Sequence, residues 1–409
     1  MYKCPVCRRN LPSHYASEVV FIRGEESYNI CVMCIPLFKT IKDTSVCPKC
    51  KKKVVRGIVH KKCYDTLLCE SCSKINPDEG TMCKKCKECG IVCFHCGKIH
   101  SLYKKDYIKQ ENPIDNKPIY FNESCWNEVC ETLRRHSETN DNRFLPDNRR
   151  KELYLGVELE VECKNNRVIS AYLMNRKSGK TLLYKSDGSL NNGFEINSYP
   201  ATLEYHSNNY MWEAYLEYLR ELHCLSHNTR TCGIHVHLSK SFMNKAERTK
   251  LTMFIHSQRR RLAIFARRPG TGYSRFKKFL KSAKYQKEGC NTSHYDAINF
   301  RTETAEIRIF RGTLKYDTFM AILELCDAMA RFSLKVKFKS LLNRNVSWKE
   351  FIAFITELKY KYLLPYLNEK NLLTHKDSLE YDRDETDNTD NSGLAPYEGN
   401  YDDDLRGNY

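Results

Sequence analysis

The sequence predicts an α+β protein in which an antiparallel sheet, with helices packed on one face, follows several small cysteine-rich modules. Two observations in the 409-residue chain support this prediction. In the second half, four segments alternate apolar with ionisable residues, as half-buried strands do, and longer segments repeat with a helical period. In the first 130 residues, 16 of the 21 cysteines occur, mostly as C-x-x-C pairs. The two halves therefore predict different architectures.

The clearest alternating segment is Leu155–Glu162. As a strand it turns its apolar residues to one face and three glutamates to the other: Glu158, Glu160 and Glu162. Carboxylates two positions apart on one face lie about 7 Å from each other. If that face is half buried, each neighbouring pair repels by about 2–3 kcal/mol at an effective dielectric near 20. Either solvent covers this face or cations bind to it.

Three further alternating segments favour bound cations. They span residues 185–196, 232–238 and 305–311, and each would place ionisable side chains on the front of the same sheet. These side chains are Asp187, Glu195, His235, His237, Glu306 and Arg308. Carboxylates, imidazoles and an arginine together suit hard divalent cations and a phosphate. The sequence therefore predicts a concave, charged sheet face.

Four motifs in a fixed order resemble a known family. They are GVELEVE at 156–162, DGSL followed by GFEI at 187–196, GIHVHL at 233–238 and EIRIFRGT at 306–313. Over about residues 150–340 the chain resembles the phage and fungal amidoligases, which are regarded as ATP-dependent carboxylate–amine ligases related in fold to glutamine synthetase and glutamate–cysteine ligase. The resemblance implies a glutamine-synthetase-like sheet and an enzyme that forms an amide or isopeptide bond through an acyl phosphate.

The charged strand faces and the resemblance together predict the groups that hold ATP and two Mg²⁺ ions. The expected cofactor-binding residues are Glu158, Glu160, Glu195, His235, His237 and Glu306. Which of the two histidines binds metal stays open. Arg308 and Arg311 are expected to stabilise the transferring phosphoryl group, and Asp187 to hold or deprotonate the amine.

A basic cluster ends the segment expected to form a helix over 244–268. The resemblance favours Arg267 or Arg268 for the nucleotide phosphates. Two other interpretations stay open, complementing the helix dipole and binding an acidic partner or nucleic acid. The loop at 197–200 matches the serine–proline turn of the family only loosely.

The C-x-x-C pairs predict structural zinc sites, because in a reducing compartment such spacing is typical of zinc ligation rather than of disulfides. The expected pairing is Cys4 and Cys7 with Cys31 and Cys34, Cys47 and Cys50 with Cys69 and Cys72, and Cys93 and Cys96 with Cys125 and Cys130. It defines zinc-ribbon units at about 1–40, 41–90 and 91–131. Left over are His60, Cys63, Cys83, Cys86 and Cys89, which either form an interleaved site or change this pairing. The ribbons serve folding alone, or they bind a protein or nucleic acid.

The remaining organisation follows from composition and periodicity. We expect a linker at 132–151, a catalytic domain at 152–375 and a disordered acidic tail at 376–409. The tail carries a charge of −8, which leaves +25 on the rest of a chain of net charge +17. In the catalytic domain the expected strands include Val168–Leu173 and Thr181–Tyr184, and the expected helices are Tyr210–His223, Asn244–Arg268, Tyr316–Lys335 and Trp348–Tyr362.

No apolar run reaches 18 residues and the N-terminus lacks the apolar region of a signal peptide. We therefore expect no membrane partner and a cytoplasmic location, in the host cytoplasm if the protein is viral. The carboxylate and the amine would come from a peptide, a cell-wall precursor or an amino acid. Two alternatives remain: a zinc-binding interaction protein with a non-catalytic C-terminal fold, and a zinc enzyme using His235, His237 and Glu306.

Overall fold

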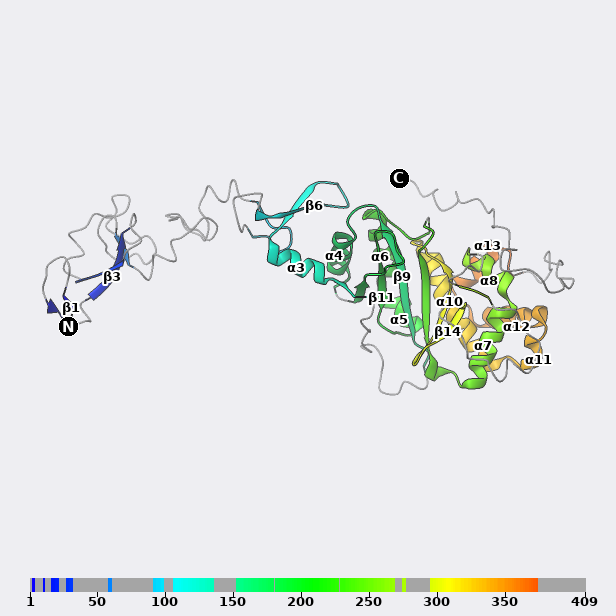
Figure 1. Ribbon diagram of the computed structural model, residues 1–409. Coiled ribbons are helices and arrows are strands. Elements are labelled where there is room, and N and C mark those ends of the chain that lie inside the picture. The colour runs from blue at the N-terminus through cyan, green and yellow to red at the C-terminus, as the bar shows by residue number, and fades with distance from the viewer. Residues whose placement is uncertain are drawn as a thin grey trace. The chain divides into compact units, whose positions relative to one another are not determined.

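A computed structural model describes residues 91–98, 106–135, 152–179, 181–227, 229–268, 274–276 and 295–373, together with five short strands nearer the N-terminus (Figure 1). The chain divides into two compact units, Met1–Gln110 with Lys117–Glu128, and Glu111–Asn116 with Val129–Tyr409. The expected acidic tail and most of the expected linker lie outside the described residues. No helix in the described ranges is long and apolar enough to cross a membrane.

The first unit contains short antiparallel pairings. Its strands are β1 (Tyr2–Lys3), β2 (Asn10–Leu11), β3 (Ala16–Phe21), β4 (Ser27–Cys31) and β5 (Ile58–His60). β1 pairs with β2, and β3 lies between β4 and β5. One sheet thus joins residues on both sides of the boundary expected near residue 40. Farther along come the hairpin β6 (Ile108–Glu111) and β7 (Pro118–Phe121), then helix α3 (Glu123–Glu131).

The second unit is built around an eight-stranded sheet. Its strands are β8 (Leu133–Arg134), β9 (Leu155–Cys163), β10 (Leu182–Lys185), β11 (Gly193–Ser198), β12 (Cys224–Leu225), β13 (Gly233–Ser239), β14 (Ile298–Phe300) and β15 (Thr304–Arg311). The order is β14-β15-β13-β9-β11-β10-β8, and β12 pairs with the end of β9. All pairs are antiparallel except β8 with β10. The α+β class is confirmed, but the sheet is mixed, because residues expected in the linker join it as β8.

Helices pack on the apolar side of this sheet. They are α4 (Arg167–Ser178), α5 (Leu203–Asn208), α6 (Trp212–Glu221), α7 (Lys245–Ser257), α8 (Arg259–Ala266), α10 (Tyr316–Lys335), α11 (Phe338–Leu341), α12 (Arg344–Leu358) and α13 (Leu363–Glu369), with the 3-10 turn η5 (Lys240–Phe242). The long helix α10, yellow in Figure 1, contacts β13 and the helices α5, α6, α7, α12 and α13. Val157, Leu159, Ile234 and Ile307 supply the sheet's side of this core and are at most 1% exposed.

The strand expected at Val168–Leu173 is wrong, because these residues belong to α4. Asn166 caps this helix by accepting a hydrogen bond from the backbone of Val168, and Gly179 ends it in the left-handed region at φ 59°. Two good caps outweigh the slight preference of β-branched residues for strands. The neighbouring strand expected at Thr181–Tyr184 is confirmed as β10.

The helix expected at Asn244–Arg268 begins as predicted and then breaks. Asn244 and Glu247 form a reciprocal capping box at the start of α7. Gln258 leaves helical geometry at φ −93° and ψ 19°, and α8 starts at the next residue. The Gln258 amide donates to the carbonyl of Arg344 and to the hydroxyl of Ser347 on α12, so a tertiary contact fixes the break. The helix expected at Tyr316–Lys335 is confirmed as α10.

Candidate metal and phosphate site

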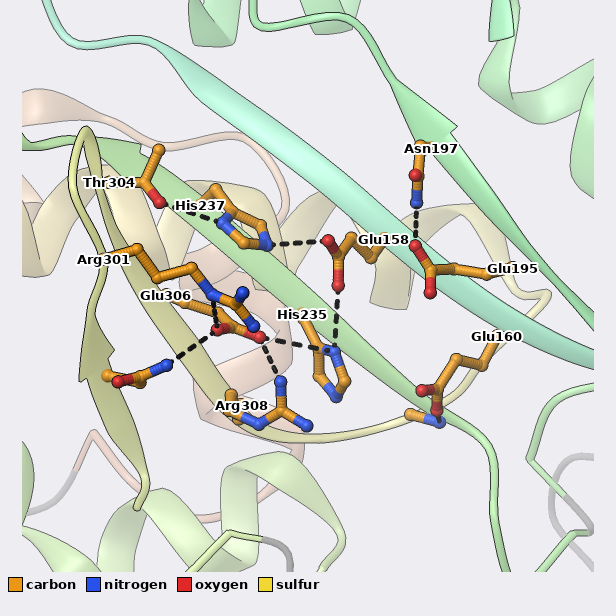
Figure 2. Close-up of polar contacts among 12 residues, drawn as sticks. Glu158, Glu160, Glu195, Asn197, His235, His237, Arg301, Thr304, Glu306 and Arg308 are labelled. Atoms are coloured by element: carbon orange, nitrogen blue, oxygen red, sulfur yellow. Dashed lines mark hydrogen bonds and ion pairs between the residues drawn. The ribbon is translucent and has the colours of Figure 1, made fainter. Parts of the chain in front are cut away.

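The register of the sheet brings the expected carboxylates and imidazoles to one face. Glu158 of β9 lies directly opposite His235 on β13 and Asn197 on β11. Glu160 lies opposite Glu195. Residues opposite each other in neighbouring strands share a face. Figure 2 shows Glu158 and His235 pointing toward each other from adjacent strands, and Asn197 donating a hydrogen bond to Glu195.

Most of this face is buried, although Glu158 keeps a side-chain exposure of 25% and Glu162 is also partly exposed. Exposure is 0% for Glu306, 2% for Glu195 and 6% for both Glu160 and His235. Burying several carboxylates requires compensating positive charge, since an unpaired buried charge is costly. Of the three alternating glutamates only Glu160 is buried, so solvent alone does not account for this face. Counter-charges supplied by the protein or by bound cations remain.

A group of three residues can hold a cation. Glu158, His237 and Glu306 each offer a ligand atom, and these atoms all lie within 4.8 Å of one another. His237 Nε2 lies 3.0 Å from Glu158 Oε1, while its Nδ1 lies 3.1 Å from the hydroxyl of Thr304. A second partner that fixes the ring is typical of metal-binding histidines. The two carboxylates suit Mg²⁺ or Mn²⁺, and the imidazole also suits Zn²⁺.

His235 adds a second imidazole next to this group. Its Nδ1 lies 3.3 Å from Glu158 Oε2 and 3.7 Å from Glu306 Oε1. Both histidines thus contact Glu158, one at each carboxylate oxygen, and His235 also contacts Glu306, as Figure 2 shows. Only His237 belongs to the three-residue group among the described residues, which favours it as the metal-binding histidine.

Glu306 is the most enclosed carboxylate of the site. It accepts hydrogen bonds from Arg301 Nε at 2.9 Å and Asn299 Nδ2 at 3.2 Å, and from Arg308 Nη1. Sequence reasoning missed Asn299, Arg301 and Thr304, as it missed Asn197 on β11. Asn299 lies directly opposite Glu306, in the pairing of β14 with β15.

A β-bulge decides where Arg311 points. The register of β13 with β15 shifts between Ile234 and Val236, so that Ile234 faces Phe310 whereas Val236 faces Ile307. Strict alternation would turn Arg311 to the same face as Ile307. The extra residue instead places it opposite Gly233, on the charged face, as bulges redirect side chains. Arg311 Nε donates to the carbonyl of His227 at 2.6 Å.

The carboxylates differ in proton affinity. Burial raises the pKa of Glu158, but the charges and hydrogen bonds of His237 and His235 outweigh it and hold the pKa well below its usual value. Burial also opposes ionisation of Glu306, yet the same two histidines lower its pKa to about 2. Burial and the charge of Glu158 raise the pKa of Glu195 to about 7. The site thus holds carboxylates of very different proton affinity side by side.

The side chains of Glu160 and Arg268 both lie beside Gly233, where the missing side chain leaves space. Its Oε2 accepts the backbone N–H of Gly233 at 2.6 Å. A Cβ at Gly233 would lie 2.9 Å from Arg268 Nη1 and 3.5 Å from Glu160 Oε2, so glycine permits this approach. Burial lowers the pKa of Arg268; the charge of Glu160 opposes this shift, and Arg308 adds to it. Arg267 instead donates to the carbonyl of Gly312 at 3.3 Å.

Asp187 and Glu162, two of the expected front-face residues, lie at the margin of the candidate site. Asp187 is half-buried in the turn before β11 and accepts the N–H of Ser189 at 2.8 Å. Its charge is among the causes that raise the pKa of Glu160, after burial. Glu162 accepts hydrogen bonds from Thr231 and from the backbone of Asn191, so it holds loops and stays outside the metal group.

A second candidate metal site lies in the first unit. The sulfur atoms of Cys93, Cys96 and Cys125 all lie within 4.8 Å of one another. Gly97 closes the turn by donating to the carbonyl of Cys93, and Asn122 N donates to Cys93 Sγ at 3.4 Å. Burial raises the pKa of Cys93, but backbone N–H donors outweigh it and lower the pKa, which favours the thiolate that metals bind.

The fourth cysteine expected in this site, Cys130, is not in the group. It follows Cys125 by five positions on α3, which places it about 140° away around the helix axis. The other predicted zinc ligands are Cys4, Cys7, Cys31, Cys34, Cys47, Cys50, Cys69 and Cys72. Their side chains, like those of the unassigned His60, Cys63, Cys83, Cys86 and Cys89, lie outside the described residues.

The two cysteines of α3 provide a matched test. In the full-length protein, Cys125→Ser is expected to lose one zinc ion per chain, because it removes one of three converging sulfurs. Cys130→Ser is expected to keep all the zinc of the wild type. Native mass spectrometry counts the bound ions. Equal zinc content in the two variants would contradict the three-cysteine site.

Comparisons with known proteins give no assignment. Neither the models of known protein families nor the curated proteins match this chain. A function for the protein therefore depends on the geometry of the charged sheet face and on the motifs that form it.

Proposed function

We propose that the protein is an ATP-dependent carboxylate–amine ligase whose active site is the charged face of the sheet. The observation that carries this proposal is the group of Glu158, His237 and Glu306 on three adjacent strands. The group lies in a buried face that also contains Arg308 and, next to Glu160, Arg268. Carboxylates can hold a metal ion and arginines can bind phosphate oxygens. A site with both suits a metal-bound polyphosphate better than a site with only one of them.

The described residues fit divalent cations and phosphate in two neighbouring zones. Glu158, His237 and Glu306 would hold a Mg²⁺ ion, which when bound neutralises charge on the phosphates of ATP. The guanidinium groups of Arg308 and Arg268 would bind phosphate oxygens through charge-assisted hydrogen bonds. Arg308 Nε is buried and has no hydrogen-bond partner among the described residues, so this donor is available for an anion.

In the proposed reaction, a carboxylate oxygen of the first substrate attacks the γ-phosphorus of ATP and ADP leaves. The resulting acyl phosphate is attacked by an amine nitrogen, and phosphate leaves as the amide forms. The amine gives up a proton, for which Asp187 is the proposed acceptor. Shielding the acyl phosphate from water favours the amide over hydrolysis, and the buried face contributes to this shielding.

The test uses hydroxylamine in place of the unknown amine, because it converts acyl phosphates to coloured hydroxamates. The full-length protein is incubated with Mg-ATP and a pool of peptides and amino acids. We expect hydroxamate formation that depends on ATP, and at least a 100-fold loss in Glu158→Gln. Glu217→Gln, which changes an exposed carboxylate on α6, is the control and should behave like the wild type.

The result that would reject the ligase is failure of the wild-type protein to bind Mg-ATP by calorimetry. Binding to nucleic acid that weakens steeply with rising salt, without nucleotide binding, would instead support the interaction-protein alternative. Chelation of zinc from the first unit should leave nucleotide binding in place, because the described ligand groups of the two sites share no residue.

A further inference from the structure

Two buried thiols meet at the end of the central strand. Cys163 is the last residue of β9 and Cys224 is the first residue of β12, and the two lie directly opposite each other. Their sulfur atoms are 2.9 Å apart, and both residues are buried. Neither residue takes part in the proposed reaction.

The backbone geometry at this pair suits a covalent bond. Lys164 N donates to the carbonyl of His223, the residues next to the pair, so Cys163 and Cys224 occupy a non-hydrogen-bonded position of the antiparallel ladder. At such positions the Cα atoms lie about 4.5 Å apart and the side chains approach most closely. A disulfide accepts Cα separations of about 4.4–6.8 Å. No large backbone movement is needed to join the two sulfurs.

The segment that follows Cys224 reaches the charged face. We call residues 224–227 and 229–233 the strap. Ser226 Oγ donates to the carbonyl of Glu160 at 2.7 Å, and the N–H of Gly233 donates to the Glu160 side chain at 2.6 Å. The carbonyl of His227 accepts from Arg311. The strap therefore positions Glu160 and Arg311 of the candidate active site. Its first residue is Cys224, one of the two thiols of the pair.

We propose that Cys163 and Cys224 form a disulfide that ties the strap to the central strand. A low-molecular-weight disulfide is the oxidant. One cysteine thiolate attacks it, forming a mixed disulfide and releasing one thiolate; the second cysteine thiolate then attacks the mixed disulfide and releases the other. Two protein thiols are oxidised and the small disulfide is reduced; its two released thiolates take up, through solvent, the two protons that the cysteines lose.

Access to the pair requires local opening. β12 has only two residues and pairs with β9 alone among the described strands. Short elements of this kind open far more often than the whole domain unfolds. Oxidation is therefore expected to be slow in the folded protein, and the bond, once formed, to resist reduction because both sulfurs are buried.

The test maps disulfides in the full-length protein after incubation with glutathione disulfide. Free thiols are alkylated in denaturant and peptides are identified by mass spectrometry. The expected product is a linked pair of peptides that contain Cys163 and Cys224. The control is Cys232→Ala, which removes another buried thiol of the strap and should leave the linkage in place.

Thermal unfolding gives a second measurement. The disulfide would close a loop of about 60 residues, so oxidised wild type is expected to melt about 5–10 °C above oxidised Cys163→Ala or Cys163→Ser. Recovery of Cys163 and Cys224 as alkylated free thiols, or linkage of Cys224 to Cys232, would overturn the proposal. The outcome does not depend on ligase activity, so the two proposals can fail separately.

Discussion

Replacing Glu306 with glutamine is expected to lower the free energy of unfolding by about 3–5 kcal/mol, because it leaves a buried arginine unpaired. Glu306 is fully buried and accepts hydrogen bonds from Arg308, Arg301 and Asn299. Glutamine keeps the volume and one oxygen but removes the negative charge. Arg308, which is only 8% exposed, would then keep its positive charge in a site of low dielectric.

Urea unfolding at pH 7 without divalent cations measures this effect. The double variant Glu306→Gln with Arg308→Gln should recover part of the lost stability, because it removes both charges of the pair. Glu217→Gln, at an exposed position, should stay within about 0.5 kcal/mol of the wild type. A single variant as stable as the wild type would show that the buried ion pair does not stabilise the charged face.

Glu306→Gln should also lose the stabilisation that a bound cation gives to the folded protein. In the wild type, Mn²⁺ is expected to raise the melting temperature, because an ion that binds only the folded state stabilises it. In the variant this increase should disappear, since one of the three ligands has lost its charge. The Glu217→Gln control should keep the full increase.

The alternating segments predicted the charged face because a strand has a period of two and needs no knowledge of its neighbours. Glu158, His235, His237 and Glu306 were expected on one face, and the register places them there. The order of the motifs could not predict the register shift between β13 and β15. It therefore could not predict on which face Arg311 lies. That shift depends on how two strands pair, which neither strand encodes alone.

Helix geometry explains two other differences. Residues 168–173 contain several apolar residues in a short run, and a short run does not distinguish a strand from a buried helix. The caps at Asn166 and Gly179 were the local signal that could have decided it. For Cys130, spacing suggested a partner for Cys125, but a helix places residues five positions apart on different faces. The approach of Arg268 to the space beside Gly233 brings distant segments together and could not be expected from spacing.

The buried histidine of α5 should make the domain less stable in acid. His206 Nε2 lies 2.9 Å from the carbonyl of Leu155, and its Nδ1 accepts the indole N–H of Trp212 at 3.2 Å. The ring is therefore neutral, with its proton on Nε2. It is completely buried and stacks on Tyr210 and Trp212. Burial lowers its pKa to about 4, although the hydrogen bond to Leu155 opposes that shift.

The direction of the pH effect follows from this shift. In the unfolded chain a histidine has a pKa near 6.5, so between pH 6.5 and 4 the unfolded state binds the proton that the folded state excludes. The stabilisation from neutral His206 is complete above pH 6.5 and is lost as the pH falls toward 4, by about 3 kcal/mol in total. Chemical denaturation across this range should show a slope of about 1.4 kcal/mol per pH unit from this residue.

Comparing variants isolates His206 from the other titrating groups. His206→Gln should lower stability at pH 7, because it disturbs the stack, and should also flatten the stability curve between pH 4 and 6.5. His223→Asn changes an exposed histidine in the left-handed region, a conformation that asparagine adopts readily, and should keep the wild-type slope. An unchanged slope in His206→Gln would mean that the folded state binds a proton on His206 as readily as the unfolded chain does. The proton would then have to displace the hydrogen bond from Trp212, so the same experiment also tests the packing of α5 and α6 against the central strand.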